Sequence, residues 1–158
     1  MPEFNQRDYQ VVFVTGKNRY TDIMKRLATI DLNDNIAVLP YISNMPAVLP
    51  KVDVIVGRSG ATSIAEITAL GIAGGVFIPS PYVTADHQTK NTMSLVNAGA
   101  GGIMIKEDEL NGNSLLKVVD DLMTNDTKRK QMATNSKQLG GVPDASDRVL
   151  SLGRSIKK

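Results

Sequence analysis

The sequence of 158 residues contains no cysteine, no tryptophan and a single histidine, and these absences exclude several kinds of chemistry. Without cysteine the chain can form neither a disulfide nor a thiolate nucleophile, which is typical of a cytosolic protein. One histidine without any cysteine argues against a zinc site, and no motif indicates a metal or another cofactor. A Ser-His catalytic triad would depend on His87 alone, and the Gly-x-Ser-x-Gly elbow of serine hydrolases is missing.

The net charge and the aromatic content are also low, and long apolar runs are missing. Aromatic residues make up 4% of the chain and the net charge is +2, so neither the stacking platform nor the basic surface of a nucleic-acid-binding protein is indicated. No apolar run reaches the length of a transmembrane helix, and the N-terminus lacks the apolar core of a signal peptide. With 42% hydrophobic and 22% charged residues, the composition predicts one soluble domain over residues 1–158.

Short apolar runs rich in β-branched residues predict strands that are buried on both faces of a sheet. They lie at 10–15, 35–39, 53–56, 75–79 and 101–105. Helical patterns separate or follow them, at 19–29, 44–49, 61–70, 86–98, 112–124, 126–138 and 144–157. This alternation predicts an α/β fold: a Rossmann-like parallel sheet of about five strands with helices on both faces and right-handed crossovers.

Polar residues gather where the predicted strands end. In such folds ligands bind outside the carboxyl ends of the strands. Residues 15–18, 40–42, 58–60 and 79–91 all fall at this edge of the sheet. The first of these segments lacks the earlier glycine and the following Ser or Thr of a Walker A loop, so an ATPase is not indicated. Lys17 is interpreted as a solvated lysine or as a helper at the rim of the site.

Residues 58–66 carry the most informative pattern, because a buried strand ends there in a small-residue turn that opens into a helix. The first N–H groups of such a helix have no internal partner and can hold an anion such as phosphate. Glu66 shares a face with Ser63 and Thr62, and a carboxylate there suits adjacent hydroxyls such as those of a ribose. The structural alternative is a capping box from Ser63 to Glu66, or a cap formed by Thr62 or Ser59.

A second polar cluster follows the next strand at 86–91. Gln88 and Asn91 lie one helical turn apart, and amides that both donate and accept hydrogen bonds suit sugar hydroxyls. The alternative is a polar outer face of a helix, with His87 as a surface residue near its start. Taken in order along the chain, the two clusters provide groups that suit an anion, a diol and the hydroxyls of a sugar. This combination indicates a nucleotide-sugar site.

Two further segments allow simpler interpretations. Residues 41–46 form either a loop that packs its own apolar groups or a base-binding segment. In the second case the backbone of Ile42 would read the edge of a planar base, with Tyr41 and Met45 flanking it. The basic run 128–130 and the tail 157–158 are interpreted as solvated charges.

Together these stretches resemble the MurG family, the bacterial glycosyltransferases that add N-acetylglucosamine to an undecaprenyl-linked muramyl-pentapeptide. The resemblance runs nearly end to end. It rests on residues 11–17, Tyr41-Ile42-x-x-Met45, 53–66, 78–81, His87-Gln88-x-x-Asn91, 98–100 and 143–145. It implies that the chain is most of the donor-binding domain, the second of two Rossmann-like domains in a GT-B arrangement, without that domain's first strand and Gly-Gly-Ser loop.

The resemblance also implies roles for the site residues. The uracil would be read by the backbone of Ile42 with Tyr41 and Met45 beside it, and the ribose hydroxyls would be held by Glu66. Arg58, Ser59 and Gly60 would be among the substrate-binding residues, and the amides of Ala61, Thr62 and Ser63 would face the diphosphate and sugar. The N-acetylglucosamine hydroxyls would contact His87, Gln88 and Asn91. No catalytic residue and no metal ligand is expected in this chain.

The implied partners are UDP-N-acetylglucosamine and a separate N-terminal domain that binds the lipid-linked acceptor. In full-length form such a protein would lie peripherally on the cytoplasmic face of the bacterial cell membrane. The chain would then be a fragment, a shortened version or a naturally split protein. Two alternatives stay open: the soluble subunit of a split lipid-linked N-acetylglucosamine transferase, as in the dolichol-linked enzyme, and a nucleotide-binding module without catalysis.

The absent first strand leads to a prediction about the sheet. In the usual doubly wound order, 3-2-1-4-5-6, that strand lies in the middle of the sheet, between the strands at 10–15 and 53–56. We expect these two strands either to pair with each other or to accept a segment from another copy, which would give a homodimer. Direct pairing is favoured because it needs no partner.

Overall fold

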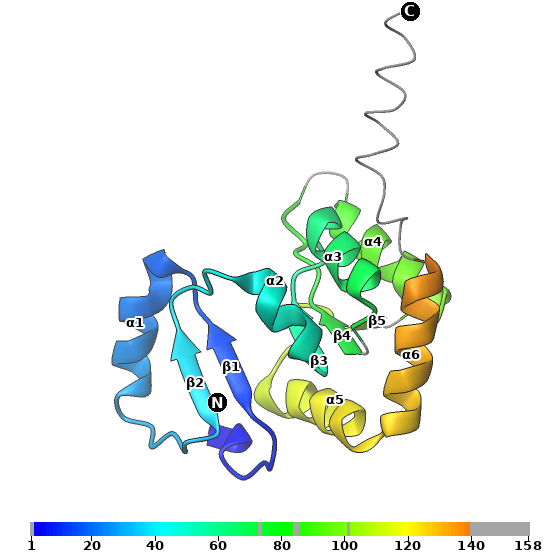
Figure 1. Cartoon of the computed structure of the whole chain (residues 1–158). Coiled ribbons are helices and arrows are strands. Elements are labelled where there is room, and N and C mark those ends of the chain that lie inside the picture. The colour runs from blue at the N-terminus through cyan, green and yellow to red at the C-terminus, as the bar shows by residue number, and fades with distance from the viewer. Residues whose placement is uncertain (1, 73, 84–85, 101, 140–158) are drawn as a thin grey trace, which may run out of the picture.

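The computed structural model describes residues 2–72, 74–83, 86–100 and 102–139, and these form strands and helices that alternate along the chain (Figure 1). The strands are β1 (Val11–Val14), β2 (Ile36–Leu39), β3 (Val54–Gly57), β4 (Gly74–Phe77) and β5 (Gly102–Met104). The helices are α1 (Lys17–Leu27), α2 (Met45–Val48), α3 (Ala61–Leu70), α4 (His87–Asn97), α5 (Gly112–Thr124) and α6 (Asp126–Leu139), with 3-10 turns η1 (Pro2–Phe4) and η2 (Leu49–Lys51). The predicted α/β class is confirmed. The helix expected at 144–157 and the matched residues 143–145 lie outside the described residues.

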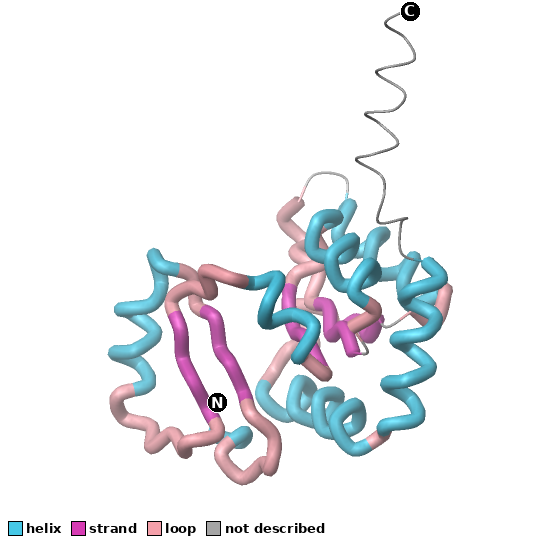
Figure 2. The backbone as a smooth tube through the Cα atoms, viewed as in Figure 1, coloured by secondary structure: helices cyan, strands magenta, loops and turns pink. Residues whose placement is uncertain are grey.

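The strands belong to two separate parallel sheets (Figure 2). β1 pairs with β2, with Val11 opposite Ile36, and β4 lies between β3 and β5. Within the described residues β1 and β3 do not pair, so the prediction of one continuous sheet and the favoured direct pairing of 10–15 with 53–56 are wrong. The sheet divides at the place where the doubly wound order puts the absent strand.

Helix α5 supports both sheets from one face. Its residue Val119 belongs to a core cluster with Phe4 and Ile36 in the β1–β2 half, while Leu122 belongs to a cluster with Val76 of β4. Leu115 packs against both clusters. The helix begins with a capping box, since Asn111 and Ser114 each accept a backbone hydrogen bond from the other. One well-capped amphipathic helix therefore contributes to the cores of both sheets.

The opposite face of the three-stranded sheet is covered by α3 and α4. Ile67 of α3, Phe77 of β4 and Leu95 of α4 form a third core cluster, which also includes Leu49 of η2. All four residues of β4 are buried, as predicted for a central strand. Val12 of β1 and Val56 of β3 are not buried. Their side chains are 52% and 42% exposed, because their strands lie next to the division between the sheets.

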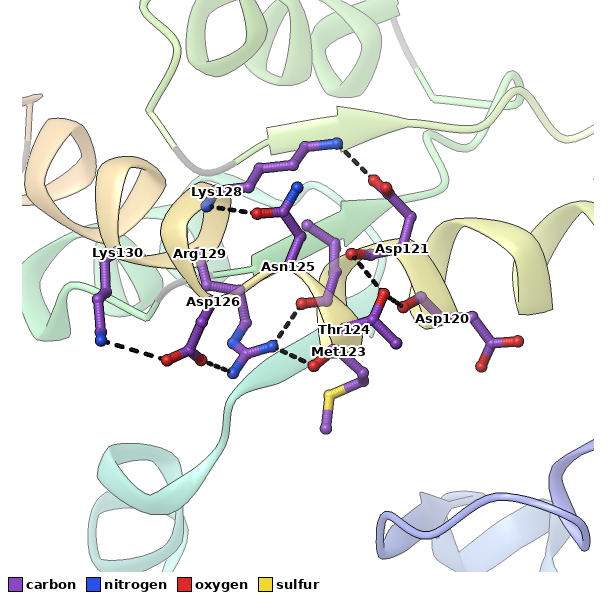
Figure 3. Close-up of polar contacts among 10 residues, drawn as sticks. Asp120, Asp121, Met123, Thr124, Asn125, Asp126, Lys128, Arg129 and Lys130 are labelled. Carbon is purple, nitrogen blue, oxygen red and sulfur yellow. Dashed lines mark hydrogen bonds and ion pairs between the residues drawn. The ribbon is translucent and has the colours of Figure 1, made fainter.

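Arg129 stabilises the turn between α5 and α6 (Figure 3). Its guanidinium donates to the carbonyl oxygens of Leu122 and Met123 and pairs with Asp126, and its side chain is only 14% exposed. Carbonyl groups in the last turn of a helix have no partner within the helix, so a cation that binds them stabilises that end. The interpretation of the run 128–130 as solvated charges is therefore wrong for Arg129.

A second ionic cluster fastens the segment before β1 to α5. Arg7 donates to both carboxylate oxygens of Asp120, at 2.7 to 3.0 Å, and the Tyr9 hydroxyl donates to Oδ1 at 2.8 Å. The hydrogen bonds from Arg7 hold the pKa of the Asp120 carboxyl below its ordinary value of 3.8. Burial and the hydrogen bond to Asp120 raise the pKa of the Tyr9 hydroxyl. The cluster anchors the two-stranded sheet to the rest of the chain.

This cluster predicts a loss of stability in acid. Because the folded-state pKa of Asp120 is lowered, its contribution is present above the unfolded pKa and is lost as the pH falls through the folded one. We expect the unfolding free energy of the wild type to fall more than that of Asp120→Asn between about pH 6 and about pH 2, measured by urea titration. Asp22→Asn, on the exposed surface of α1, is the control for a lost charge and should behave like the wild type. Equal losses in the wild type and Asp120→Asn would contradict the prediction.

Candidate functional site

The two polar clusters predicted from the sequence meet at the carboxyl ends of β3 and β4. The fully buried Ser59 hydroxyl donates to the carbonyl oxygen of Gln88 at 2.9 Å, and Nδ2 of Asn91 donates to the carbonyl oxygen of Ser59 at 3.3 Å. Oε1 of Gln88 accepts from the backbone N–H of Ser80 at 2.9 Å. The side-chain amides expected at the sugar therefore also join the loops after the two strands.

The start of α3 is open at this edge. Gly60 is the N-cap residue and no side chain caps the helix, whose first internal hydrogen bond runs from the Ile64 N–H to the Gly60 carbonyl. Within the described residues, no hydrogen bond uses the N–H groups of Ala61, Thr62 or Ser63. The capping-box alternative for Ser63 is wrong, because a glycine occupies the cap. The three N–H groups and the positive end of the helix dipole are left for an anion.

Glu66 lies one turn further along α3, at an exposed position. It forms no hydrogen bond and no ion pair with the part of the chain that the structure describes. The carboxylate therefore does not stabilise the helix start, and it is accessible to a ligand on the face that it shares with Thr62 and Ser63.

Arg58, between β3 and α3, contacts the neighbouring strand ends. Its Nη1 donates to the carbonyl oxygens of Ile78 and Pro79, at 3.1 and 3.2 Å, and forms a 2.6 Å ion pair with Glu107. These contacts tie the loop after β4 to the segment after β5. In this structure Arg58 positions the rim of the site.

The loops after β1 and β2 form the other part of the edge. Nζ of Lys17 lies 4.9 Å from the ring centre of Tyr41, a cation–π contact, and Tyr41 is 59% exposed. Ile42 is half-buried, and Met45 packs against the core cluster that contains Ile67 of α3. This packing brings the segment after β2 next to α3. Sequence reasoning missed the pair of Lys17 and Tyr41, although both residues follow neighbouring parallel strands.

One expectation about these loops needs correction, and another is confirmed. Lys17 is the first residue of α1 instead of a loop residue, because Gly16 adopts a positive φ of 79° and lets the helix begin directly. The helical segment predicted at 44–49 is confirmed as α2 and the start of η2, and Asn44 caps α2 by accepting a hydrogen bond from the Ala47 N–H.

His87 is the first residue of α4 and is exposed. The N-cap residue before it, Asp86, has a positive φ of 53°, which is uncommon for a residue other than glycine. Strained backbone of this kind clusters at ligand-binding and active sites. His87 therefore lies at the strained entrance of the helix that also carries Gln88 and Asn91.

The rest of the described chain has fewer features that indicate a binding site. An open cavity of about 480 Å³ lies at the amino ends of β1 and β2, away from the predicted site, and is lined by Asn5, Arg7 and residues 32–35. Nδ2 of Asn35 donates there to three backbone carbonyls, so that side chain serves to hold the loop. Among the described residues no group of three His, Cys, Asp or Glu side chains is placed to hold a metal ion.

Comparison with known proteins places this arrangement in context. Residues 2–149 match the glycosyltransferase family 28 C-terminal domain. A Levilactobacillus brevis protein is 59% identical over the whole chain, and a Lactiplantibacillus plantarum protein is 54% identical over the same length. Both are named UDP-N-acetylglucosamine–N-acetylmuramyl-(pentapeptide) pyrophosphoryl-undecaprenol N-acetylglucosamine transferase. The chain spans 43% of the length of each, so it corresponds to less than half of these proteins.

Solved structures show the same fold. The crystal structure of Acinetobacter baumannii MurG superposes with a TM-score of 0.78 at 27% identity, over 96% of this chain and 43% of that one. The spinosyn forosaminyltransferase SpnP superposes with a TM-score of 0.68 at 13% identity, over 99% of this chain and 46% of that one, which supports the fold alone. The chain thus has the fold of one part of a larger GT-B glycosyltransferase.

Proposed function

The chain belongs to glycosyltransferase family 28 as its C-terminal domain, and on this premise we propose that residues 1–158 form a single UDP-sugar-binding domain. Its ligand is UDP-N-acetylglucosamine, and it is the donor half of an inverting enzyme that adds N-acetylglucosamine to an undecaprenyl-linked muramyl-pentapeptide during peptidoglycan synthesis. The names of its relatives and the chemistry of its strand ends both support this assignment.

The observation that carries the proposal is the open start of α3. Among the described residues, three consecutive N–H groups, of Ala61, Thr62 and Ser63, lack partners at the carboxyl edge of a parallel sheet, and the Glu66 carboxylate one turn away also has none. A nucleoside diphosphate sugar presents both an anion and a ribose diol, the two groups that these N–H groups and this carboxylate can bind. In this proposal the N–H groups bind the diphosphate and Glu66 accepts hydrogen bonds from the ribose hydroxyls.

The remaining predicted residues have three roles in this proposal. Ile42 would read the uracil through its backbone, with Tyr41 and Met45 beside it. Gln88, Asn91 and His87 would contact the sugar, using the donors and acceptors that their loop contacts leave free. Ser59 and Arg58 would hold the loops in register instead of binding the donor directly, as their hydrogen bonds indicate.

The chemistry of this half is the stabilisation of a leaving group. In the full reaction an acceptor hydroxyl oxygen forms a bond to the anomeric carbon, the bond to the diphosphate oxygen breaks, and the configuration inverts. The hydroxyl proton passes to a base in the acceptor half. Negative charge grows on the departing UDP, where fixed N–H groups and a helix dipole stabilise it without reorganisation.

The proposal implies partners outside this chain: an N-terminal domain that binds the lipid-linked acceptor, and the cytoplasmic face of the bacterial cell membrane, where the complete enzyme would lie peripherally. Within the described residues no helix combines the length and the hydrophobicity needed to cross a bilayer. A second copy of the chain, bound through the unpaired strands in a homodimer, is a further partner that the sequence analysis predicts.

Binding of the donor is the first test. We expect titration with UDP-N-acetylglucosamine to shift amide resonances of residues 41–45, 58–66 and 87–91 in a 1H–15N NMR spectrum of the chain. The residues around Asn5 and Arg7, which line the open cavity, should not respond. An unchanged spectrum at ligand concentrations of about 1 mM or more would overturn the proposal, because such ligand excess detects even weak sites.

A further inference from the structure

Glu107, in the segment after β5, is a charged residue at the rim of the site to which the sequence patterns assign no role. Its backbone is held on both sides. The N–H of Ile105 donates to the carbonyl of Phe77 in β4 at 3.0 Å, and the carbonyl of Glu107 accepts from the N–H of Leu110 at 3.4 Å. The Ile105 side chain is buried in the core cluster that contains Val76. The Glu107 side chain therefore extends from an anchored backbone position beside the carboxyl end of β4.

The Glu107 carboxylate holds Arg58 across the end of β4. Nη1 of Arg58 donates to Oε2 of Glu107 at 2.6 Å and to the carbonyl oxygens of Ile78 and Pro79 at 3.1 and 3.2 Å. The carboxylate is the charged acceptor of this set and makes its shortest contact, and a hydrogen bond between two charged groups is stronger than one to a neutral carbonyl. Glu107 therefore fixes the orientation of the guanidinium over the loop that follows β4.

The loop at 78–80 is held by two residues of the candidate site. Arg58 binds its first two carbonyl oxygens, and Oε1 of Gln88 accepts from the N–H of the next residue, Ser80, at 2.9 Å. A shift of the loop away from Arg58 would carry the Ser80 N–H with it and would displace the Gln88 amide. The contacts therefore run from Glu107 through Arg58 and the loop to Gln88, the residue that the proposed function places against the sugar.

We propose that Glu107 is a positioning residue for the sugar end of the donor site, acting through Arg58 and the loop at 78–80. This inference rests on the proposed function, in which residues 41–45 and 61–66 bind the uracil, the ribose and the diphosphate. Within the described residues no hydrogen bond joins either of those segments to Glu107. Glu107 therefore favours the sugar nucleotide over UDP alone, and it does so without touching either ligand.

The exposure of the ion pair sets the size and the sign of the effect. The side chains of Arg58 and Glu107 are 51% and 35% exposed, and pairs in such surroundings are worth at most about fivefold in an equilibrium constant. Without the carboxylate, the guanidinium is free to turn from the loop towards the diphosphate, which the proposed function places at Ala61, three residues after Arg58. Binding of UDP then stays unchanged or tightens, whereas the sugar meets a Gln88 amide that is less well placed.

Glu107→Gln tests the proposal, because it keeps the shape of the side chain and removes its charge. Calorimetric titrations of the chain with UDP-N-acetylglucosamine and with UDP measure the ratio of the two affinities. We expect Glu107→Gln to lower the affinity for the sugar nucleotide about three- to fivefold and to leave the affinity for UDP unchanged or higher. Glu109→Gln, an equal loss of charge at an exposed position of the same segment, should leave both affinities at their wild-type values.

Two further variants test the route through Arg58. In Arg58→Gln the ratio should already be low, and adding Glu107→Gln should lower it no further, as expected for residues that act as one unit. Glu107→Asp keeps the charge on a shorter side chain and should give a ratio between those of the wild type and Glu107→Gln. If Arg58→Gln does not fold, the ratios in the two Glu107 variants decide the matter.

The ratio separates this proposal from simpler roles of Glu107. Equal weakening of both ligands in Glu107→Gln would indicate a structural role, and equal tightening would indicate an effect of charge alone. Either result, or an unchanged ratio, would overturn the proposal while donor binding by the wild type left the proposed function standing. A wild-type chain that binds neither ligand would overturn the proposed function and this inference with it.

Discussion

The purified chain is expected to transfer no N-acetylglucosamine to a lipid-linked acceptor, even when saturated with donor. Glycosyl transfer needs both substrates held in one geometry, and such positioning is worth effective concentrations of about 10⁵–10⁸ M. In the proposed function the residues of this chain bind the donor, whereas the base and the acceptor site would belong to the other half. Radiolabelled UDP-N-acetylglucosamine and a lipid-linked muramyl-pentapeptide, separated by chromatography, would measure the product.

The full-length Levilactobacillus brevis relative, assayed with the same substrates, is the positive control for this result. Product formed by the relative but not by the chain is the expected outcome. Turnover by the chain alone would refute the assignment of catalysis to the missing half. Donor binding without transfer, even after the remaining part of the relative is added, would favour a nucleotide-binding module without catalysis.

Replacing Glu66 with alanine is expected to weaken donor binding while leaving the fold intact. A carboxylate that accepts hydrogen bonds from a ribose contributes about ten- to hundredfold in affinity. Glu66 has no partner in the described chain, so its loss should change the unfolding free energy by about 0.5 kcal/mol or less. Calorimetric titration with UDP-N-acetylglucosamine and urea unfolding of the same variant measure the two effects.

Two further variants serve as controls for the effect of Glu66→Ala. Glu109→Ala removes an exposed carboxylate away from α3 and should alter neither quantity. Gln88→Ala removes the acceptor for the Ser80 N–H, so it should lower both stability and affinity. Unchanged affinity in Glu66→Ala would eliminate the ribose role. If Glu66→Ala lowered the unfolding free energy by about 1 kcal/mol and left the affinity for the donor unchanged, Glu66 would instead have a structural role at the start of α3.

Local patterns were enough to predict most of the elements. The spans of α3 and α5 agree with the expected 61–70 and 112–124, since apolar periodicity and the small-residue or Asn starts are local signals. The carboxyl-edge location of the site followed from the alternation of strands and helices. The cap at Gly60 was missed because Ser and Thr are stronger cap formers in isolation, and only the turn geometry shows that they are not used.

Tertiary contacts account for the errors. Arg129 sits in a run of basic residues that is typical of a solvated surface, yet the end of α5 happens to lie within its reach. The division of the sheet could not be decided from strand patterns, because it depends on whether β1 can reach β3 or is held apart by its packing on α5. The pairing of Lys17 with Tyr41 likewise depends on the register of two strands.

The attachment of β1 to α5 has a consequence for biosynthesis. The contacts of Arg7 and Tyr9 with Asp120 join residues that are 113 and 111 positions apart in the sequence, a span that takes about 6–23 s to translate at about 5–20 residues per second. Until α5 leaves the ribosome, β1 and β2 are a two-stranded sheet without its main support, and such sheets are marginal in water. The nascent chain would therefore expose Val11 and Ile36, which share a core cluster with Val119 of α5 in the complete fold, for seconds before this half is secured, a window in which chaperones bind apolar strands.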